Sequence, residues 1–178
     1  MEALTRFEEV KIPLIEPVHG LEAVSGVLWV PEWWPTGARV SIVLAHGPTG
    51  SKDEPLLVSL QHALTERKYL TLRFNFPFAE AGKKRPDPFP VLERTLLHAI
   101  ALLGPDPTAA PAHLFVGGRG IGGRVAAHLA TSQVRVDGLF FLGFLLHPPG
   151  RPEQVRVERL FGIVSPMLFV QGTRDRQC

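Results

Sequence analysis

The spacing of apolar residues changes near residue 40. Before that point, two segments that alternate between apolar and polar residues, Val10–Ile15 and Leu21–Val30, flank the turn signal His19-Gly20. This pattern predicts an antiparallel hairpin at one edge of a sheet. The stretch 31–37 contains prolines and a glycine that break either ladder, so it is expected to be a loop.

After residue 40 short apolar runs alternate with segments of helical spacing. Val40–Ala45 is a nearly continuous apolar run, typical of a strand buried on both faces. Further strands are expected at 69–76, 113–116, 136–144 and 166–170, and helices from about Glu54, at 92–103, at 125–130 and, as a short helix or turn, at 153–160. The alternation predicts an α/β fold with a mostly parallel sheet and helices on both faces.

In such a sheet ligands bind beyond the carboxyl ends of the strands. The segments that follow the expected strands are therefore the places to look for chemistry: 46–51, 76–85, 117–123, 143–150 and 172–178.

Length and composition fit a single domain spanning residues 1–178 and exclude several classes of function. The net charge is +2 and Lys83-Lys84-Arg85 is the only tight basic cluster, so nucleic-acid binding is not expected. The longest apolar stretch, Leu139–Leu146, is too short to cross a membrane. A lone Cys178 and an N-terminus without an apolar leader indicate a cytoplasmic or nuclear protein.

The glycine-rich segment Gly117–Arg124 lies between an expected strand and an expected helix. One interpretation is the dinucleotide-binding pattern Gly118-x-Gly120-x-x-Gly123. That fingerprint normally follows the first strand and needs an acid at the end of the next one, whereas Asp137 stands at the start of a strand. The other interpretation is a nucleophile elbow, G-x-S-x-G, in which Gly120 occupies the position of the nucleophile.

Several motifs occur together and in order: Ala45-His46-Gly47, the run Arg73 to Phe78, the glycine segment, Leu146-His147-Pro148-Pro149-Gly150, and the run Leu168 to Asp175. With these motifs the chain resembles the dienelactone-hydrolase-like branch of the α/β-hydrolase superfamily. Within that branch it is similar to the small family that includes testis-expressed protein 30 and the hydrolase-like domain of a chromatin-complex (NSL) subunit.

The resemblance implies roles for individual positions. The residue after the nucleophile, Ile121, would give one N–H to an oxyanion hole, and the loop at Gly47 would give another. Pro48 has no N–H, so Thr49 is the expected donor there. Asp175 matches the acid of a catalytic triad. No histidine follows it, so the sequence is expected to lack the family's last strand, histidine loop and final helix, as a C-terminally truncated domain.

Other side chains are weaker candidates. His147 follows a strand at the ligand edge and is the best substitute base, although packing within its own turn is the more ordinary role. His46 is expected to order its loop or to contact a ligand. Arg73 and Arg119 are candidate anion-binding residues, with ordinary ion pairing as the alternative. Metal-ligand spacing is not found, and no cofactor is expected.

Three hypotheses follow. The first is a pseudo-hydrolase, because Gly120 has no side chain that attacks an ester. The second is a weak ester hydrolase using non-standard residues such as His147. The third is an interaction subunit, by analogy with the chromatin-associated relative. Possible partners are a small ester or acid ligand, a protein, or a second copy pairing through an exposed strand at 166–170.

Overall fold

The computed structural model describes residues 7–32, 39–104, 112–132 and 134–177, which form one seven-stranded sheet with helices on both faces. The strands are β1 (Phe7–Val18), β2 (Leu21–Trp29), β3 (Val40–Ala45), β4 (Leu70–Phe74), β5 (His113–Arg119), β6 (Gly138–Leu142) and β7 (Met167–Val170). The helices are α1 (Pro55–Glu66), α2 (Pro77–Glu80), α3 (Phe89–Ala101), α4 (Ile121–Ala130) and the 3₁₀ turn η1 (Glu158–Gly162).

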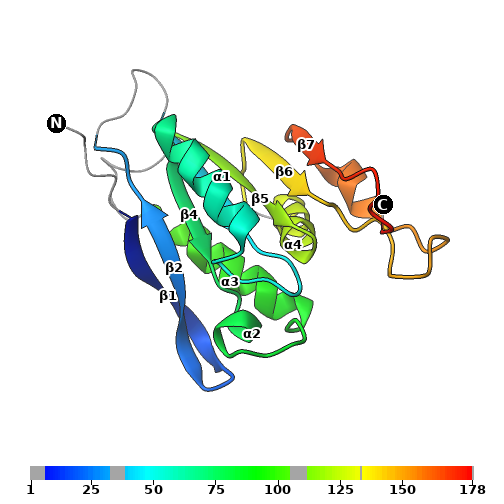
Figure 1. The fold of residues 1–178 in the computed structure, drawn as a ribbon, viewed down its shortest axis with the longest axis horizontal. Coiled ribbons are helices and arrows are strands. Elements are labelled where there is room, and N and C mark those ends of the chain that lie inside the picture. The colour runs from blue at the N-terminus through cyan, green and yellow to red at the C-terminus, as the bar shows by residue number, and fades with distance from the viewer. Residues whose placement is uncertain (1–6, 33–38, 105–111, 133, 178) are drawn as a thin grey trace.

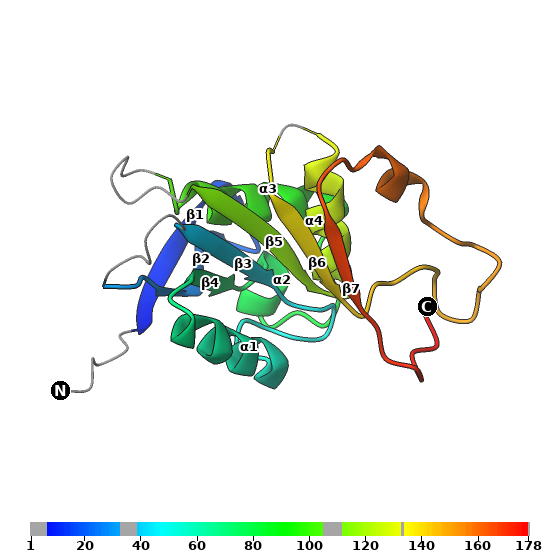
Figure 2. The same cartoon turned by 90° about the horizontal axis from the view of Figure 1, so that it is seen from above.

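The strand order is β1-β2-β4-β3-β5-β6-β7 (Figures 1 and 2). β1 pairs with β2, and β2 with β4, in antiparallel fashion, while all pairs from β4 to β7 are parallel. The predicted mostly parallel sheet with an N-terminal hairpin is therefore confirmed. The hairpin turn lies at His19 and Gly20, both with positive φ (53° and 77°), and the hairpin is longer than expected because β1 pairs from Phe7 onward.

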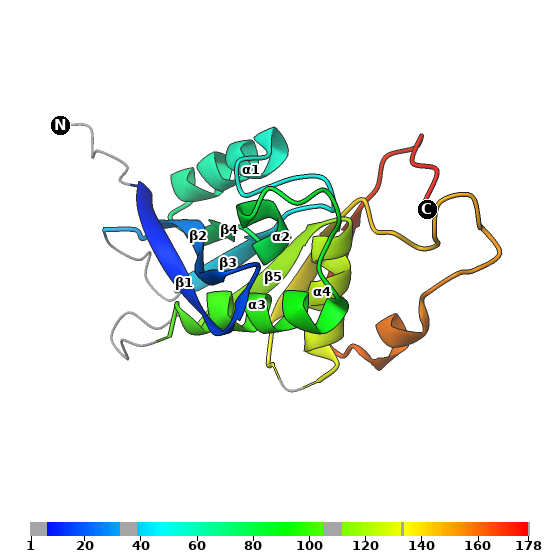
Figure 3. The same ribbon diagram turned by 90° about the horizontal axis from the view of Figure 1, so that it is seen from below.

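Helices cover the two faces of the sheet unequally. α1 lies on one face, α3 and α4 lie on the other, and α2 lies near the end of the sheet where β4 ends (Figures 2 and 3). The main core fills the space under α3 and α4, where Leu96, Val125 and Phe141 have almost no exposed surface. β3 is buried between the two layers, which explains its nearly unbroken apolar sequence.

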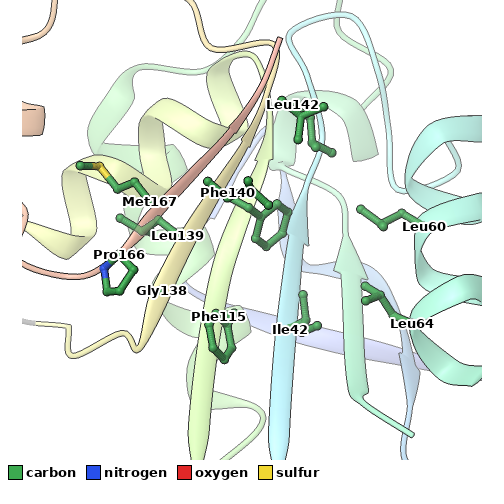
Figure 4. Close-up of a pocket in the computed structure, with 12 residues that line it drawn as sticks. Ile42, Leu60, Leu64, Phe115, Gly138, Leu139, Phe140, Leu142, Pro166 and Met167 are labelled. Atoms are coloured by element: carbon green, nitrogen blue, oxygen red, sulfur yellow. The ribbon is translucent and has the colours of Figure 1, made fainter. Parts of the chain in front are cut away.

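The α1 face is open over the last three strands. A trough of about 440 Å³ lies there, with Leu60 and Leu64 of α1 on one side and β6 and β7 on the other (Figure 4). Phe115 and Phe140 lie on its floor. β7 is the edge strand, as predicted, and the described part of the chain places no helix over this part of the sheet.

Several element boundaries differ from expectation. The loop expected after β4 contains the short helix α2, which begins at Pro77, a residue that suits a first helical turn. β5 extends to Arg119, three residues beyond the expected end. Gly117 and Gly118 carry on the strand because their backbones pair with both β3 and β6. The short helix expected at 153–160 is a 3₁₀ turn at Glu158–Gly162.

Two expectations lie partly or wholly outside the described residues: most of the 31–37 loop and Cys178. Within the described residues, none of the helices is long and apolar enough to cross a membrane.

Candidate functional site

A sharp turn connects β5 to α4 at Gly120. Its backbone has φ 52° and ψ −114°, a combination that residues with a side chain rarely adopt. The turn stands at the carboxyl end of a central parallel strand, between β3 and β6, and the helix begins at the next residue. This strand–turn–helix geometry is that of a nucleophile elbow, and it disfavours the dinucleotide interpretation, because β5 is not the first strand of the sheet.

The neighbouring glycines let the backbone of β3 approach the turn. A Cβ built at Gly118 would lie 2.0 Å from the carbonyl oxygen of Ala45. A Cβ at Gly122 would lie 2.7 Å from the carbonyl oxygens of both Ala45 and His46. The glycine-rich sequence is therefore required by packing, whether or not the turn carries a nucleophile.

Gly120 is buried beneath two apolar side chains. A Cβ at this position would lie 3.2 Å from Pro48 Cδ and 3.6 Å from Leu145 Cδ1. The position thus has neither a nucleophilic atom nor an open approach for one, although the contact distances leave room for a small side chain after a slight shift of Pro48.

The expected oxyanion-hole residues lie around this turn. Ile121 is the first residue of α4, and amides of the first helical turn have no acceptor within the helix. Across from it, the loop after β3 forms a turn in which the Gly50 N–H donates to the Gly47 carbonyl at 3.3 Å. Pro48 and Thr49 occupy the middle of this turn, and Thr49 is exposed. The structure therefore brings the loop of Gly47 and the start of α4 to the same end of the sheet.

His46 is fully buried and bonded to backbone on both sides of its ring. Its Nδ1–H donates to the Gly47 carbonyl at 2.8 Å, and its Nε2 accepts from the Phe76 N–H at 3.0 Å. Burial lowers the pKa of His46, which keeps the ring neutral. The ring has no exposed surface, and it connects the loops that follow β3 and β4, which is the loop-ordering role expected for His46.

The side chain of Arg73 also makes hydrogen bonds within the protein. Its Nε donates to Gln61 Oε1 at 2.7 Å, and its NH1 donates to Asp53 Oδ1 and to the Lys52 carbonyl, both at 2.6 Å. The side chain is largely buried between α1 and β4. Arg73 therefore has the ordinary ion-pairing role that was given as the alternative, with Asp53 as its partner.

Arg119, at the end of β5, forms an ion pair with Glu54, the residue that precedes α1. The Arg119 side chain is 47% exposed and Glu54 is 11% exposed. The pair connects the elbow to the loop after β3, since the Arg119 side chain also lies beside Gly47. The sequence did not indicate that Glu54 pairs with Arg119, because Glu54 is there only an acidic residue at the start of an expected helix.

Asp175 lies at the carboxyl end of the sheet, beside Gly143 at the end of β6. Its Oδ2 accepts from Gln171 Nε2 at 2.7 Å and its Oδ1 accepts from the Gln177 N–H at 2.9 Å. Both carboxylate oxygens thus bond to amides of the same segment, and no histidine ring bonds to either oxygen among the described residues.

His147 is largely buried, and its Nδ1–H donates to the carbonyl of Pro148 at 2.9 Å. Its backbone N–H, with that of Leu146, donates to the carbonyl of Gln177. The described carboxylates include none within 4.0 Å of the ring, so His147 lacks the acid that orients a catalytic base.

Three histidines do pair with carboxylates: His19 with Asp87, His113 with Asp137, and His128 with Glu93. The first pair is at the β1–β2 turn, the second at the amino ends of β5 and β6, and the third between α3 and α4. None of the three is at the elbow. Across the described residues, no group of three His, Cys, Asp or Glu side chains has the arrangement of a metal site.

Comparison with known proteins agrees with this geometry. Residues 38–178 match the alpha/beta hydrolase domain family, and the chain belongs to that family. Among solved structures, the dienelactone hydrolase from Anabaena variabilis superposes with a TM-score of 0.71 at 16% identity, over 97% of this chain and 89% of that one.

Two further structures have the same architecture. An esterase from Pyrococcus furiosus gives a TM-score of 0.76 at 15% identity, over 98% of this chain and 73% of that one. An alpha-beta serine hydrolase homologue from Coxiella burnetii superposes with a TM-score of 0.70 at 19% identity, over 99% of this chain and 78% of that one. Identities this low show a shared fold and carry no activity over to this chain.

Proposed function

We propose that this chain is a pseudo-hydrolase: a member of the alpha/beta hydrolase domain family that keeps the elbow and has lost ester hydrolysis. The observation that supports the proposal is Gly120, which has the strained backbone of the elbow and no side chain. Loss of a triad nucleophile leaves only the residual rate supplied by the oxyanion hole and binding. A histidine elsewhere, such as His147, would have to activate a water molecule, because Gly120 offers no side chain for a base to activate.

Within the family, the proposal places the chain with the small hydrolase-like proteins that include testis-expressed protein 30. The support is the set of ordered motifs from Ala45-His46-Gly47 to the run ending at Asp175. In this proposal the domain spans residues 1–178, and the loops at Gly47 and Ile121 form the vestige of an oxyanion hole.

Hydrolysis of p-nitrophenyl acetate and butyrate tests the proposal. The expected rate of the purified chain equals that of buffer, and His147→Ala does not change it. Turnover clearly above buffer that disappears in His147→Ala would instead support an ester hydrolase with a non-standard base.

A second observation favours self-association. Leu168, Phe169 and Val170 of β7 are 61%, 45% and 53% exposed, and β7 is an edge strand beside the trough. Exposed apolar edge strands pair readily with other strands. We therefore propose that two copies of the chain associate through β7, and sedimentation velocity at several concentrations tests this.

A further inference from the structure

A second cavity lies on the opposite face of the sheet from α1, between α4, the start of α3 and the η1 turn. Its volume is about 410 Å³, within the range of small-molecule sites. Its charged lining residues are Arg124, Arg156, Arg159 and Glu158. None of the residues that line this cavity belongs to the elbow turn or to the loop after β3, and Arg124 stands one helical turn after Gly120.

The three arginines point their charge at one cavity without an ion-pair partner in the described part of the chain; Arg124 is partly buried, and Arg156 and Arg159 are exposed. Among the described residues, no carboxylate oxygen lies within 4.0 Å of Arg124, Arg156 or Arg159, including those of Glu158. Arg124 is partly buried, and its guanidinium stands 5.8 Å from the centre of the Phe89 ring. Burial, followed by repulsion from Arg156 and Arg159, lowers the pKa of Arg124, so the like charges act on one another in this cavity.

The one acid near Arg124 on the neighbouring helix is already paired. Glu93 of α3 forms an ion pair with His128 of α4, and the His128 ring stands edge-on against Phe89. Glu93 therefore does not pair with Arg124, and the guanidinium of Arg124 stays open to an anion from solution.

The remaining walls of the cavity are apolar. Phe89, Ala127, Phe144 and Leu160 line it together with the arginines. Guanidinium groups bind phosphate oxygens through paired N–H donors, and three of them around one cavity match a dianion better than a monoanion. Aromatic walls favour a ligand whose anionic group is attached to an apolar or aromatic body.

We propose that this cavity binds a small organic phosphate, with the phosphate held by Arg124, Arg156 and Arg159 and the apolar part against Phe89 and Phe144. The site is independent of the elbow, so it stands whether or not the chain hydrolyses esters.

Calorimetric titration with phenyl phosphate tests the proposal, with inorganic phosphate and benzyl alcohol as the charge-only and shape-only probes. We expect one phenyl phosphate per chain, at least about tenfold weaker binding of inorganic phosphate, and no binding of benzyl alcohol. Arg124→Gln and Arg156→Gln should each weaken phenyl phosphate binding about tenfold or more, which corresponds to losing one hydrogen bond to a charged group. Arg67→Gln, the same charge change at an exposed site at the end of α1, is the matched control and should bind as the unmodified chain does.

Thermal unfolding separates loss of the site from loss of the fold. Without ligand, Arg156→Gln should melt no lower than the unmodified chain, because the substitution removes repulsion, while the rise in melting temperature caused by phenyl phosphate should disappear. Absence of phenyl phosphate binding at roughly ten millimolar would overturn the site, since even a weak millimolar affinity is detectable there. Affinity that Arg124→Gln and Arg156→Gln leave unchanged would overturn it too, and equal affinity for inorganic phosphate and phenyl phosphate would overturn the role of the apolar walls.

Discussion

The Nε2 atom of His46 accepts a hydrogen bond from the backbone N–H of Phe76 at 3.0 Å, entirely inside the protein. This bond joins the loops that follow β3 and β4, the neighbouring strands beside the elbow. The ring also packs edge-on against Phe76 and Phe78, with centroids 5.0 Å and 5.4 Å away. His46 therefore holds the ligand-side loops together without taking part in chemistry.

His46→Ala is expected to lower the free energy of unfolding by about 2–4 kcal/mol, because it leaves a cavity and an unsatisfied Phe76 N–H. His62→Ala, at an exposed position of α1, is the control and should change it by less than about 0.5 kcal/mol. Urea unfolding at neutral pH measures both. Equal stabilities of the two variants would show that His46 does not hold the loops.

The same histidine predicts a pH dependence. The pKa of His46 in the folded chain lies below 6.5, so below about pH 6.5 the unfolded state takes up a proton that the folded state does not. Its contribution to stability is full above that pH and declines as the pH falls toward the folded-state pKa. Urea unfolding at pH 7.5 and 5.5 should show a smaller decline for His46→Gln than for the unmodified chain, and an identical decline would contradict the assignment.

Glu80 predicts a second pH dependence of the folding stability, at lower pH than that of His46. Burial opposes its charge, but hydrogen bonds from Asn75 and Ser25 more than offset burial and lower its pKa below 4.5. A lowered carboxyl pKa stabilises the fold above about pH 4.5, and this stabilisation is lost as the pH falls through the folded-state pKa. Glu80→Gln should therefore lose less stability between pH 5 and pH 3 than the unmodified chain in thermal unfolding. Glu66→Gln, at an exposed position of α1, is the control and should lose as much stability between pH 5 and pH 3 as the unmodified chain.

The close contact between β3 and β5 predicts a strong difference between two glycines. In Gly118→Ala the new methyl group would overlap the carbonyl of Ala45, so the backbone must shift, at an expected cost of about 3 kcal/mol or more. In Gly172→Ala the methyl group meets nothing within 4 Å, and the change should stay within about 0.5 kcal/mol. Chemical denaturation compares them, and similar costs would refute the close approach at the elbow.

The exposed β7 edge predicts self-association. Sedimentation velocity should show dimers whose proportion rises with concentration, and Leu168→Lys should shift the chain toward monomer, because charge on an edge strand opposes pairing. Ile15→Lys, on the edge strand β1 where Ile15 is 79% exposed, is the matched control and should leave the dimer in place. A chain that stays monomeric at all concentrations would exclude association through β7.

The elbow was predictable from the sequence because its backbone conformation and close packing require glycine at positions next to one another in the chain. Gly118 and Gly122 allow the close approach of the β3 backbone and Gly120 allows the positive φ of the turn, and both requirements are visible in the residue types alone. The hairpin and the parallel strands were predictable for the same reason, since their apolar patterns repeat within each element.

Contacts between distant elements were not predictable. The burial of Arg73 depends on Gln61 and Asp53, which reach it only once α1 lies on β4. The arginine cavity likewise joins α4 to a 3₁₀ turn beyond β6, and nothing in the local sequence of either segment indicates that they meet. The sequence showed which residue types were present at these positions and not which partners they would find.

The missing nucleophile at Gly120 can be tested directly by covalent labelling. The purified chain is incubated with a fluorophosphonate probe and with an activated acyl ester, and intact mass spectrometry measures any covalent adduct. Gly120→Ser is the companion variant, and its stability should fall by about 1–3 kcal/mol because serine must adopt the strained backbone of the elbow. The unmodified chain is expected to keep its mass; a stoichiometric phosphonyl or acyl adduct on it would contradict the proposal that this hydrolase fold no longer hydrolyses esters.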